Sequence, residues 1–112
     1  MIIAIPVLNN KLCMHFGHCE TFVFFDVEQH SKKIIGRKEL IPPPHEPGIL
    51  PGWISKQGVE LVIVGGMGQH AQELFKQSNV KVIVGVDEVD PEKIIINYLN
   101  NDLKTGSNTC DH

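Results

Sequence analysis

The first part of the chain alternates short apolar runs with polar turns. The runs IIAIPVL (2–8), TFVFFDV (21–27) and KKIIGRKELI (32–41) are rich in β-branched and aromatic side chains, a composition typical of strands. A polar EQHSK segment alone lies between the second and third runs, which favours a β-hairpin. We therefore predict three strands that can meander.

A proline-rich segment interrupts this pattern. Residues 42–52 carry five of the seven prolines, and proline is excluded from helix interiors and central strands. We therefore predict a surface loop. The apolar residues between Ile49 and Ile54 have helical spacing and predict a short helix that stops at Gly58.

The second half of the chain alternates strand and helix patterns. ELVIVGG (60–66) is a continuous apolar run, typical of a strand buried on both faces of a parallel sheet. Helical spacing in residues 68–78 and the run VKVIVGV (80–86) complete a predicted strand-helix-strand unit. Asp90 is a predicted N-cap with Pro91 at the first position of a last helix. The polar tail, residues 100–112, is predicted to be irregular and flexible.

Together these elements predict one α/β domain over residues 1–112, with a mixed sheet of about five strands and helices on its faces. The size agrees, because 112 residues with 42% hydrophobic content suit one core. A net charge of -3 gives little attraction for a nucleic acid. The apolar runs stop well short of a membrane span, and three cysteines are a poor disulfide framework. We expect a cytoplasmic protein with reduced thiols and with neither nucleic-acid nor membrane partners.

The stretch CMHFGHC holds the densest group of candidate ligands. It brings two thiols and two imidazoles into seven residues: Cys13, His15, His18 and Cys19. These donors suit zinc, copper or an iron-sulfur species and do not suit magnesium or calcium. The spacing is not that of a zinc finger, and at most three of the four are expected to face one point. The alternative interpretation is that Phe16 fills the core, Gly17 makes a turn and the polar residues are solvated.

A second cluster, VIVGGMGQHA, follows a strand and opens a helix. Gly66, Gly68 and Ala71 fit the GxGxxA form of a dinucleotide turn, with Asp87 after the next strand. However, the strand is fourth in the chain and a second half for a dinucleotide is missing. The alternative is a tight turn at a helix N-terminus, whose free amides favour an anionic group.

The chain ends in Cys110-Asp111-His112. A frayed tail is the default interpretation, but a tail that folds back over the first loop could complete a site there. The sequence has no GxSxG elbow, and no Asn or Asp is placed by sequence to orient a Cys/His pair. We therefore expect a binding protein rather than an enzyme.

Several of these motifs, taken in order, resemble one family. HFGHC after a first strand, the proline-rich loop, VIVGGMG before a helix and the ending YLNNDLKTGSNTCDH are similar to the dinitrogenase iron-molybdenum cofactor biosynthesis family, also called nitrogenase accessory factor-like proteins. The resemblance implies a ribonuclease H-like three-layer α/β/α fold with a five-stranded mixed sheet. It also implies a carrier that binds an iron-sulfur or iron-molybdenum cluster precursor transiently and catalyses no reaction.

The resemblance and the ligand density together give a set of expected ligands. The metal ligands are expected among His15, His18 and Cys19, with Cys13, Cys110 and His112 as completers. The glycine turn, with Gly66, Met67 and Gly68, is the expected cofactor-binding segment. Other soft metals stay open as cargo.

The expected partners are proteins that donate or accept the cluster, with a P-loop ATPase as one candidate, and the expected state is a monomer or a weak homodimer. A second hypothesis is a non-catalytic interaction or regulatory module that docks on an ATPase or a cluster-assembly protein through the proline-rich loop and an exposed Trp53. A third is a dinucleotide-dependent enzyme, which rests on GGMGQHA alone.

Overall fold

The computed structural model describes residues 1–13, 16, 19–43 and 49–106. Its strands are β1 (Ile2–Leu8), β2 (Lys11–Leu12), β3 (Thr21–Glu28), β4 (Lys33–Leu40), β5 (Val59–Ile63) and β6 (Lys81–Ile83). Its helices are α1 (Ile49–Lys56), α2 (Gln69–Gln77) and α3 (Pro91–Leu99). Within these described ranges, no helix is long and apolar enough to cross a membrane.

The sheet is mixed, with the strand order β4-β3-β1-β5-β6. The three N-terminal strands β1, β3 and β4 pair antiparallel in sequence order, as the hairpin pattern predicts. β5 is parallel to both β1 and β6, so this strand lies inside the sheet. The prediction of strand, helix and strand in residues 60–86 is confirmed, with β6 shorter than expected.

The sheet has a sixth strand that the apolar pattern did not predict. β2 pairs antiparallel with the end of β1, Val7 opposite Leu12. Asn9 and Asn10 between them both have positive φ, 55° and 63°, the backbone of a tight hairpin turn that asparagine tolerates. A strand of two residues is too short to show an alternation of apolar and polar side chains, which is why the sequence did not predict it. The expected count of about five strands is corrected to six.

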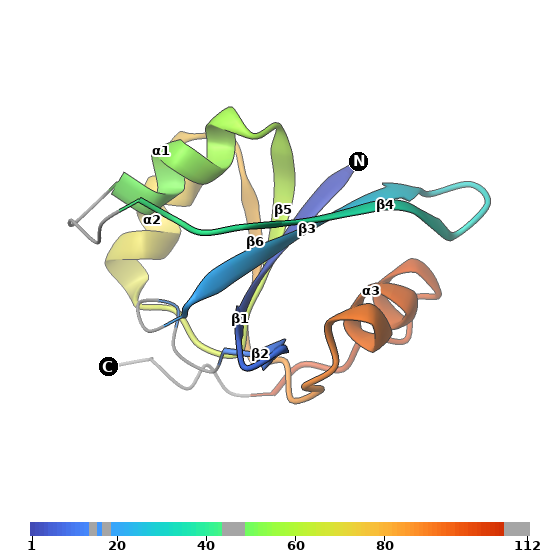
Figure 1. Ribbon diagram of the computed structural model, residues 1–112. Helices are drawn as coiled ribbons and strands as arrows, with labels where there is room; N and C mark the ends of the chain where they lie inside the picture. Colours follow the sequence, from blue (N-terminus) through green and yellow to red (C-terminus); the bar gives the residue numbers. More distant parts are fainter. Residues whose placement is uncertain (14–15, 17–18, 44–48, 107–112) are drawn as a thin grey trace.

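Helices cover both faces of the sheet, which confirms the three-layer α/β/α architecture (Figure 1). Alternate residues of β1 supply the two cores. Ile3 and Ile5 pack in one core with Ile94 of α3, whereas Ala4 packs in the other with Ile54 of α1 and with residues of α2. The alternation follows from the two-residue period of a strand.

The first helix begins inside the predicted proline loop. α1 includes Pro51, which is buried. Proline is tolerated in the first turn of a helix, because the backbone N–H groups there make no hydrogen bond within the helix. Trp53 also lies on this helix. Gly58, with φ 83°, follows the helix and ends it as predicted. Residues 44–48 of the predicted loop lie outside the described residues.

The last helix starts as the sequence predicts. The Asp90 side chain accepts a hydrogen bond from the Glu92 backbone N–H at 3.0 Å, and Pro91 is the first helical residue. After α3 the chain turns back toward the sheet, where Thr105 forms an isolated antiparallel bridge with Val86. The first part of the predicted irregular tail therefore makes defined contacts, and residues 107–112 lie outside the described part of the chain.

Candidate functional site

The segment of residues 13–19, called the thiol loop below, starts and ends at the end of β1. The Cys13 N–H donates to the Pro6 carbonyl at 2.9 Å, directly after β2. Cys19 precedes Glu20, whose N–H donates to the Val7 carbonyl at 3.1 Å. Hydrogen bonds to two successive residues of one buried strand thus fix the backbone on both sides of the loop.

The two cysteine side chains of the thiol loop contact each other through a side-chain hydrogen bond. Neither forms a disulfide with another described residue. Cys13 is buried and Cys19 is half-buried, and the Cys19 thiol also donates to the Phe16 carbonyl at 3.1 Å. The structure therefore brings two soft donors from opposite ends of the CMHFGHC motif to one point.

The environment of this pair raises the pKa of Cys19 to about 12. Burial is the main cause, and the neighbouring Cys13 sulfur adds to it, since both disfavour a negative charge on the thiolate. Cys19 is therefore a neutral thiol at neutral pH, unlike a catalytic cysteine, whose pKa is lowered. A metal ion bound here must first displace the proton, and its positive charge would offset the unfavourable charge on sulfur.

Phe16, in the middle of the thiol loop, anchors it to the core. Its ring is buried and makes edge-on contacts with Phe22 and Phe75, with ring centroids 5.8 and 5.5 Å apart. The Phe16 N–H donates to the Gly66 carbonyl at 3.1 Å. The alternative interpretation of Phe16 as a core residue is thus correct, and the same contacts place the loop against the glycine turn.

The glycine turn lies between β5 and α2. Gly66 is buried, and Gly68 is the exposed N-cap of α2 with φ −63° and ψ 154°. Met67 is 0% exposed and packs in the core with Phe75 and Val62. A side chain in that position cannot contact cargo at the surface, so any contact of Met67 with cargo could involve only its backbone.

Four of the predicted ligands lie outside the described residues: His15, His18, Cys110 and His112. Their roles stay predictions. Among the residues that the structure does describe, no group of three or more His, Cys, Asp or Glu side chains is placed to hold a metal ion. A metal ion bound to the thiol pair would therefore need further donors.

Trp53 is not the exposed partner surface that the sequence predicted. It is half-buried, and its ring makes edge-on contacts with Phe22 at 5.8 Å and Phe24 at 5.9 Å between centroids. The reason is that α1 places Trp53 over the aromatic residues of β3. This correction removes the main residue on which the interaction-module hypothesis depended.

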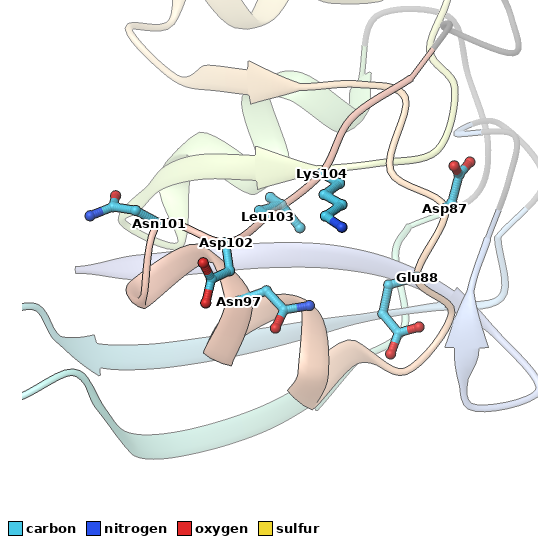
Figure 2. Close-up of a pocket in the computed structure, with 7 residues that line it drawn as sticks. All are labelled: Asp87, Glu88, Asn97, Asn101, Asp102, Leu103 and Lys104. Atoms are coloured by element: carbon cyan, nitrogen blue, oxygen red, sulfur yellow. The ribbon is translucent and has the colours of Figure 1, made fainter.

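A second region rich in carboxylates lies on the α3 side of the sheet. This open cleft, called the polar cleft below, has a volume of about 810 Å³. In Figure 2, Asp87 and Glu88 form one side and the residues at the end of α3 the other, with Lys104 between them. It is lined by Asp87, Glu88, Asn97, Asn101, Asp102, Leu103 and Lys104. Asp87, predicted to follow the strand after the glycine turn, thus lines the same cleft as Asn97 of α3 and Asp102 after it.

Sequence reasoning missed the residues that join the tail to the glycine turn. The Gly85 N–H donates to the Gly65 carbonyl at 2.8 Å, and the Gly106 N–H donates to the Gly85 carbonyl at 2.6 Å. Gly85 has φ 81°, and a glycine inside the apolar run 80–86 is the signal that could have indicated such a position.

Comparison with known proteins gives one consistent result. Residues 1–101 match the model of the dinitrogenase iron-molybdenum cofactor family. The uncharacterized protein MJ0580 of Methanocaldococcus jannaschii is 34% identical over 88 residues, which cover 73% of this chain and 72% of that protein.

Solved structures agree with this match. The crystal structure of PH0822 superposes with a TM-score of 0.85 at 28% identity, over 94% of each chain. A second M. jannaschii protein, provisionally named a dinitrogenase, superposes with a TM-score of 0.75 at 19% identity over 96% of each chain, and at this identity the likeness shows the fold alone. The predicted resemblance is thereby confirmed. The chain belongs to the dinitrogenase iron-molybdenum cofactor family.

Proposed function

We propose that this protein binds and carries a metal cluster, an iron-sulfur species or a precursor of the iron-molybdenum type. The observation that supports this most directly is the contact between the Cys13 and Cys19 thiols in a loop that is bonded to the glycine turn through Phe16. Family membership independently links the fold to the iron-molybdenum cofactor.

The chemistry of the donors fits such a cargo. Thiolates are the ligands of iron-sulfur clusters, and the imidazoles of His15 and His18 are further donors for iron. Backbone N–H groups at the N-terminus of α2 carry a partial positive charge that favours an anionic ligand. Because Phe16 bonds to Gly66, the proposed cluster would lie between the thiol loop and this helix end.

The proposed protein is a carrier and not an enzyme. The raised pKa of Cys19 supports this, since a buried neutral thiol is a poor nucleophile. We place the carrier in the cytoplasm, where reducing conditions keep thiols free. Its proposed partners are proteins that donate and accept the cluster, a P-loop ATPase among them, and it works as a monomer or weak homodimer.

The test is anaerobic purification after expression with added iron, followed by iron and sulfide analysis and an absorption spectrum. We expect iron, sulfide and a broad visible absorption band in the wild type. A variant with His15, His18 and Cys19 all replaced by alanine should lose the three signals while keeping the far-ultraviolet circular dichroism of the folded protein.

The matched control removes carboxylates instead of soft donors. Asp87→Asn combined with Asp102→Asn alters the polar cleft and should leave the iron content unchanged. A triple alanine variant that retains full iron and sulfide would contradict the proposed ligands. A colourless, iron-free wild type after reconstitution would contradict cluster binding altogether and would favour a module that acts through protein partners.

A further inference from the structure

The sulfur atoms of Cys13 and Cys19 are neighbours in the reduced protein. Their side chains share a hydrogen bond, although the two residues stand at opposite ends of the thiol loop. A disulfide bond forms only between sulfur atoms that can approach to about 2.05 Å, and hydrogen-bonded thiols need a small movement to reach that distance. The pair is therefore placed for a reaction of one sulfur with the other.

The backbone on both sides of the pair is held by hydrogen bonds that involve no sulfur. The N–H groups of Cys13 and Glu20 donate to successive carbonyls of β1, at 2.9 and 3.1 Å. A disulfide would cost the loop the bond of 3.1 Å from the Cys19 thiol to the Phe16 carbonyl, because a disulfide sulfur carries no hydrogen atom. Phe16 keeps its bond to Gly66 and its buried ring, so the sulfurs can join while the loop stays on the core.

Burial sets the order in which the two sulfurs react. Cys13 is 3% exposed, whereas Cys19 is half-buried, so an incoming molecule reaches the sulfur of Cys19 first. That sulfur attacks a small-molecule disulfide, forms a mixed disulfide and releases one thiol. Cys13 contacts Cys19, and its sulfur then attacks the Cys19 sulfur, forms the internal disulfide and releases the second thiol.

We propose that Cys13 and Cys19 are a reversible modification site, which a small-molecule disulfide converts to an internal disulfide. The pair loses two electrons and two protons, and the small-molecule disulfide takes up both to give two thiols. Disulfides in cytosolic proteins are usually transient and serve catalysis or redox sensing. The consequence for cargo rests on the proposed function: the internal disulfide removes two thiolate ligands at once, so oxidation would release a soft metal from the thiol loop.

The first measurement detects the disulfide in the whole chain, reduced and free of metal. The protein is equilibrated with mixtures of reduced and oxidised glutathione, the remaining thiols are alkylated, and the products are identified by mass spectrometry and peptide mapping. We expect one internal disulfide between Cys13 and Cys19, both in the wild type and in Cys110→Ser. A disulfide to Cys110, a disulfide between two chains, or a pair that stays reduced in every mixture would overturn the proposal.

Two matched variants, both made in the Cys110→Ser background, test the order of attack. Cys13→Ser should stop at a mixed disulfide of glutathione with Cys19, because the accessible sulfur still reacts but lacks its partner. Cys19→Ser should leave the buried Cys13 unmodified. Circular dichroism is recorded for both, since unfolding would expose Cys13. Equal glutathione adducts in two folded variants would overturn the assigned order.

The last measurement is binding of Co²⁺, whose absorption reports thiolate ligands, to the oxidised and the reduced wild type. We expect oxidation to weaken binding by more than about 100-fold, above the usual effect of losing an outer-shell residue, and reduction by a phosphine to restore it. Equal binding by both forms would overturn the release of metal. If the reduced protein shows no thiolate-to-cobalt absorption, the proposed function is wrong, whereas a disulfide found in the first measurement stands.

Discussion

The thiol loop and the polar cleft both gather residues that can bind metals, yet they differ in physical character. The thiol loop brings two sulfur atoms into contact in a half-buried position and is tied to the core by Phe16. The polar cleft offers more donors, but they line an open surface. The cation of Lys104, which would repel a metal ion, lies among them. Its carboxylates form no group placed to hold a metal within the described residues.

The difference teaches that contact and burial matter more than the number of donors. Water can hydrate carboxylates that line an open cleft, so such a cleft needs no bound ion to be stable. The Cys19 thiol, partly buried and in contact with Cys13, resists ionisation, and a bound cation would favour its thiolate form. This difference favours the thiol loop over the cleft as the proposed metal site.

The largest expected effect comes from removing the two sulfur atoms. Cys13→Ser with Cys19→Ser should weaken Co²⁺ binding by more than about 100-fold, above the usual effect of losing an outer-shell residue, because both thiolate ligands disappear. Isothermal titration of the reduced protein measures the affinity. The polar-cleft control, Asp87→Asn with Asp102→Asn, should bind as tightly as the wild type, and the reverse pattern would transfer the metal site to the cleft.

The anchor of the thiol loop gives the next largest effect. Phe16→Ala should lower the free energy of unfolding by about 3 kcal/mol, the lower part of the range for losing a buried phenylalanine, because its ring contacts with Phe22 and Phe75 disappear. Urea unfolding measures the loss. On the cleft side, Leu103→Ala should cost about 1 kcal/mol, since Leu103 is only partly buried. Equal losses in the two variants would mean that the loop is no better anchored than the cleft.

Sequence patterns predicted the parts of this comparison that depend on local structure. The β3–β4 hairpin and the Asp90 cap follow from signals within a few residues. The contact of Cys13 with Cys19 depends instead on both ends of the loop bonding to β1. The backbone hydrogen bond between Gly106 and Gly85 likewise follows from no periodicity of the sequence.

Trp53 shows the same limit of sequence reasoning at a single residue. Its place next to a proline-rich segment predicted exposure, but aromatic residues of a distant strand cover it. The sequence therefore indicated the types of donor in the candidate site and could not show which of them meet.

The pH dependence of stability should separate the two regions more subtly. Burial, and then the Cys13 sulfur, raises the pKa of Cys19 from 9.0 to about 12. Between these values the unfolded chain releases a proton that the folded protein keeps, so this contribution to stability is complete below pH 9 and falls as the pH rises toward 12.

Urea unfolding of the metal-free protein below pH 9 and between pH 9 and 12 tests this thiol contribution. The wild type should lose more stability over that interval than Cys19→Ala, which lacks the thiol and is otherwise the same chain. Parallel losses in the two proteins would contradict the buried-thiol assignment. The polar-cleft control should follow the wild type.

The smallest expected effect is at the glycine turn itself. Gly68→Ala should change the free energy of unfolding by less than about 0.5 kcal/mol, the usual range for a tolerated surface substitution. Its φ of −63° suits any L residue, and no atom lies within 4 Å of an added Cβ. Urea unfolding beside Gly85→Ala measures the contrast, since position 85 has both positive φ and a backbone neighbour.

A loss above about 1 kcal/mol for Gly68→Ala, beyond what surface substitutions usually cause, would show that the turn requires glycine for its own conformation. A small effect, together with no thermal shift on adding nicotinamide or flavin nucleotides, would separate this turn from a dinucleotide fingerprint, whose glycines allow close approach of a pyrophosphate. The glycine that constrains the architecture would then be Gly85, which lies outside the GGMG motif and connects Gly65 of the glycine turn with Gly106.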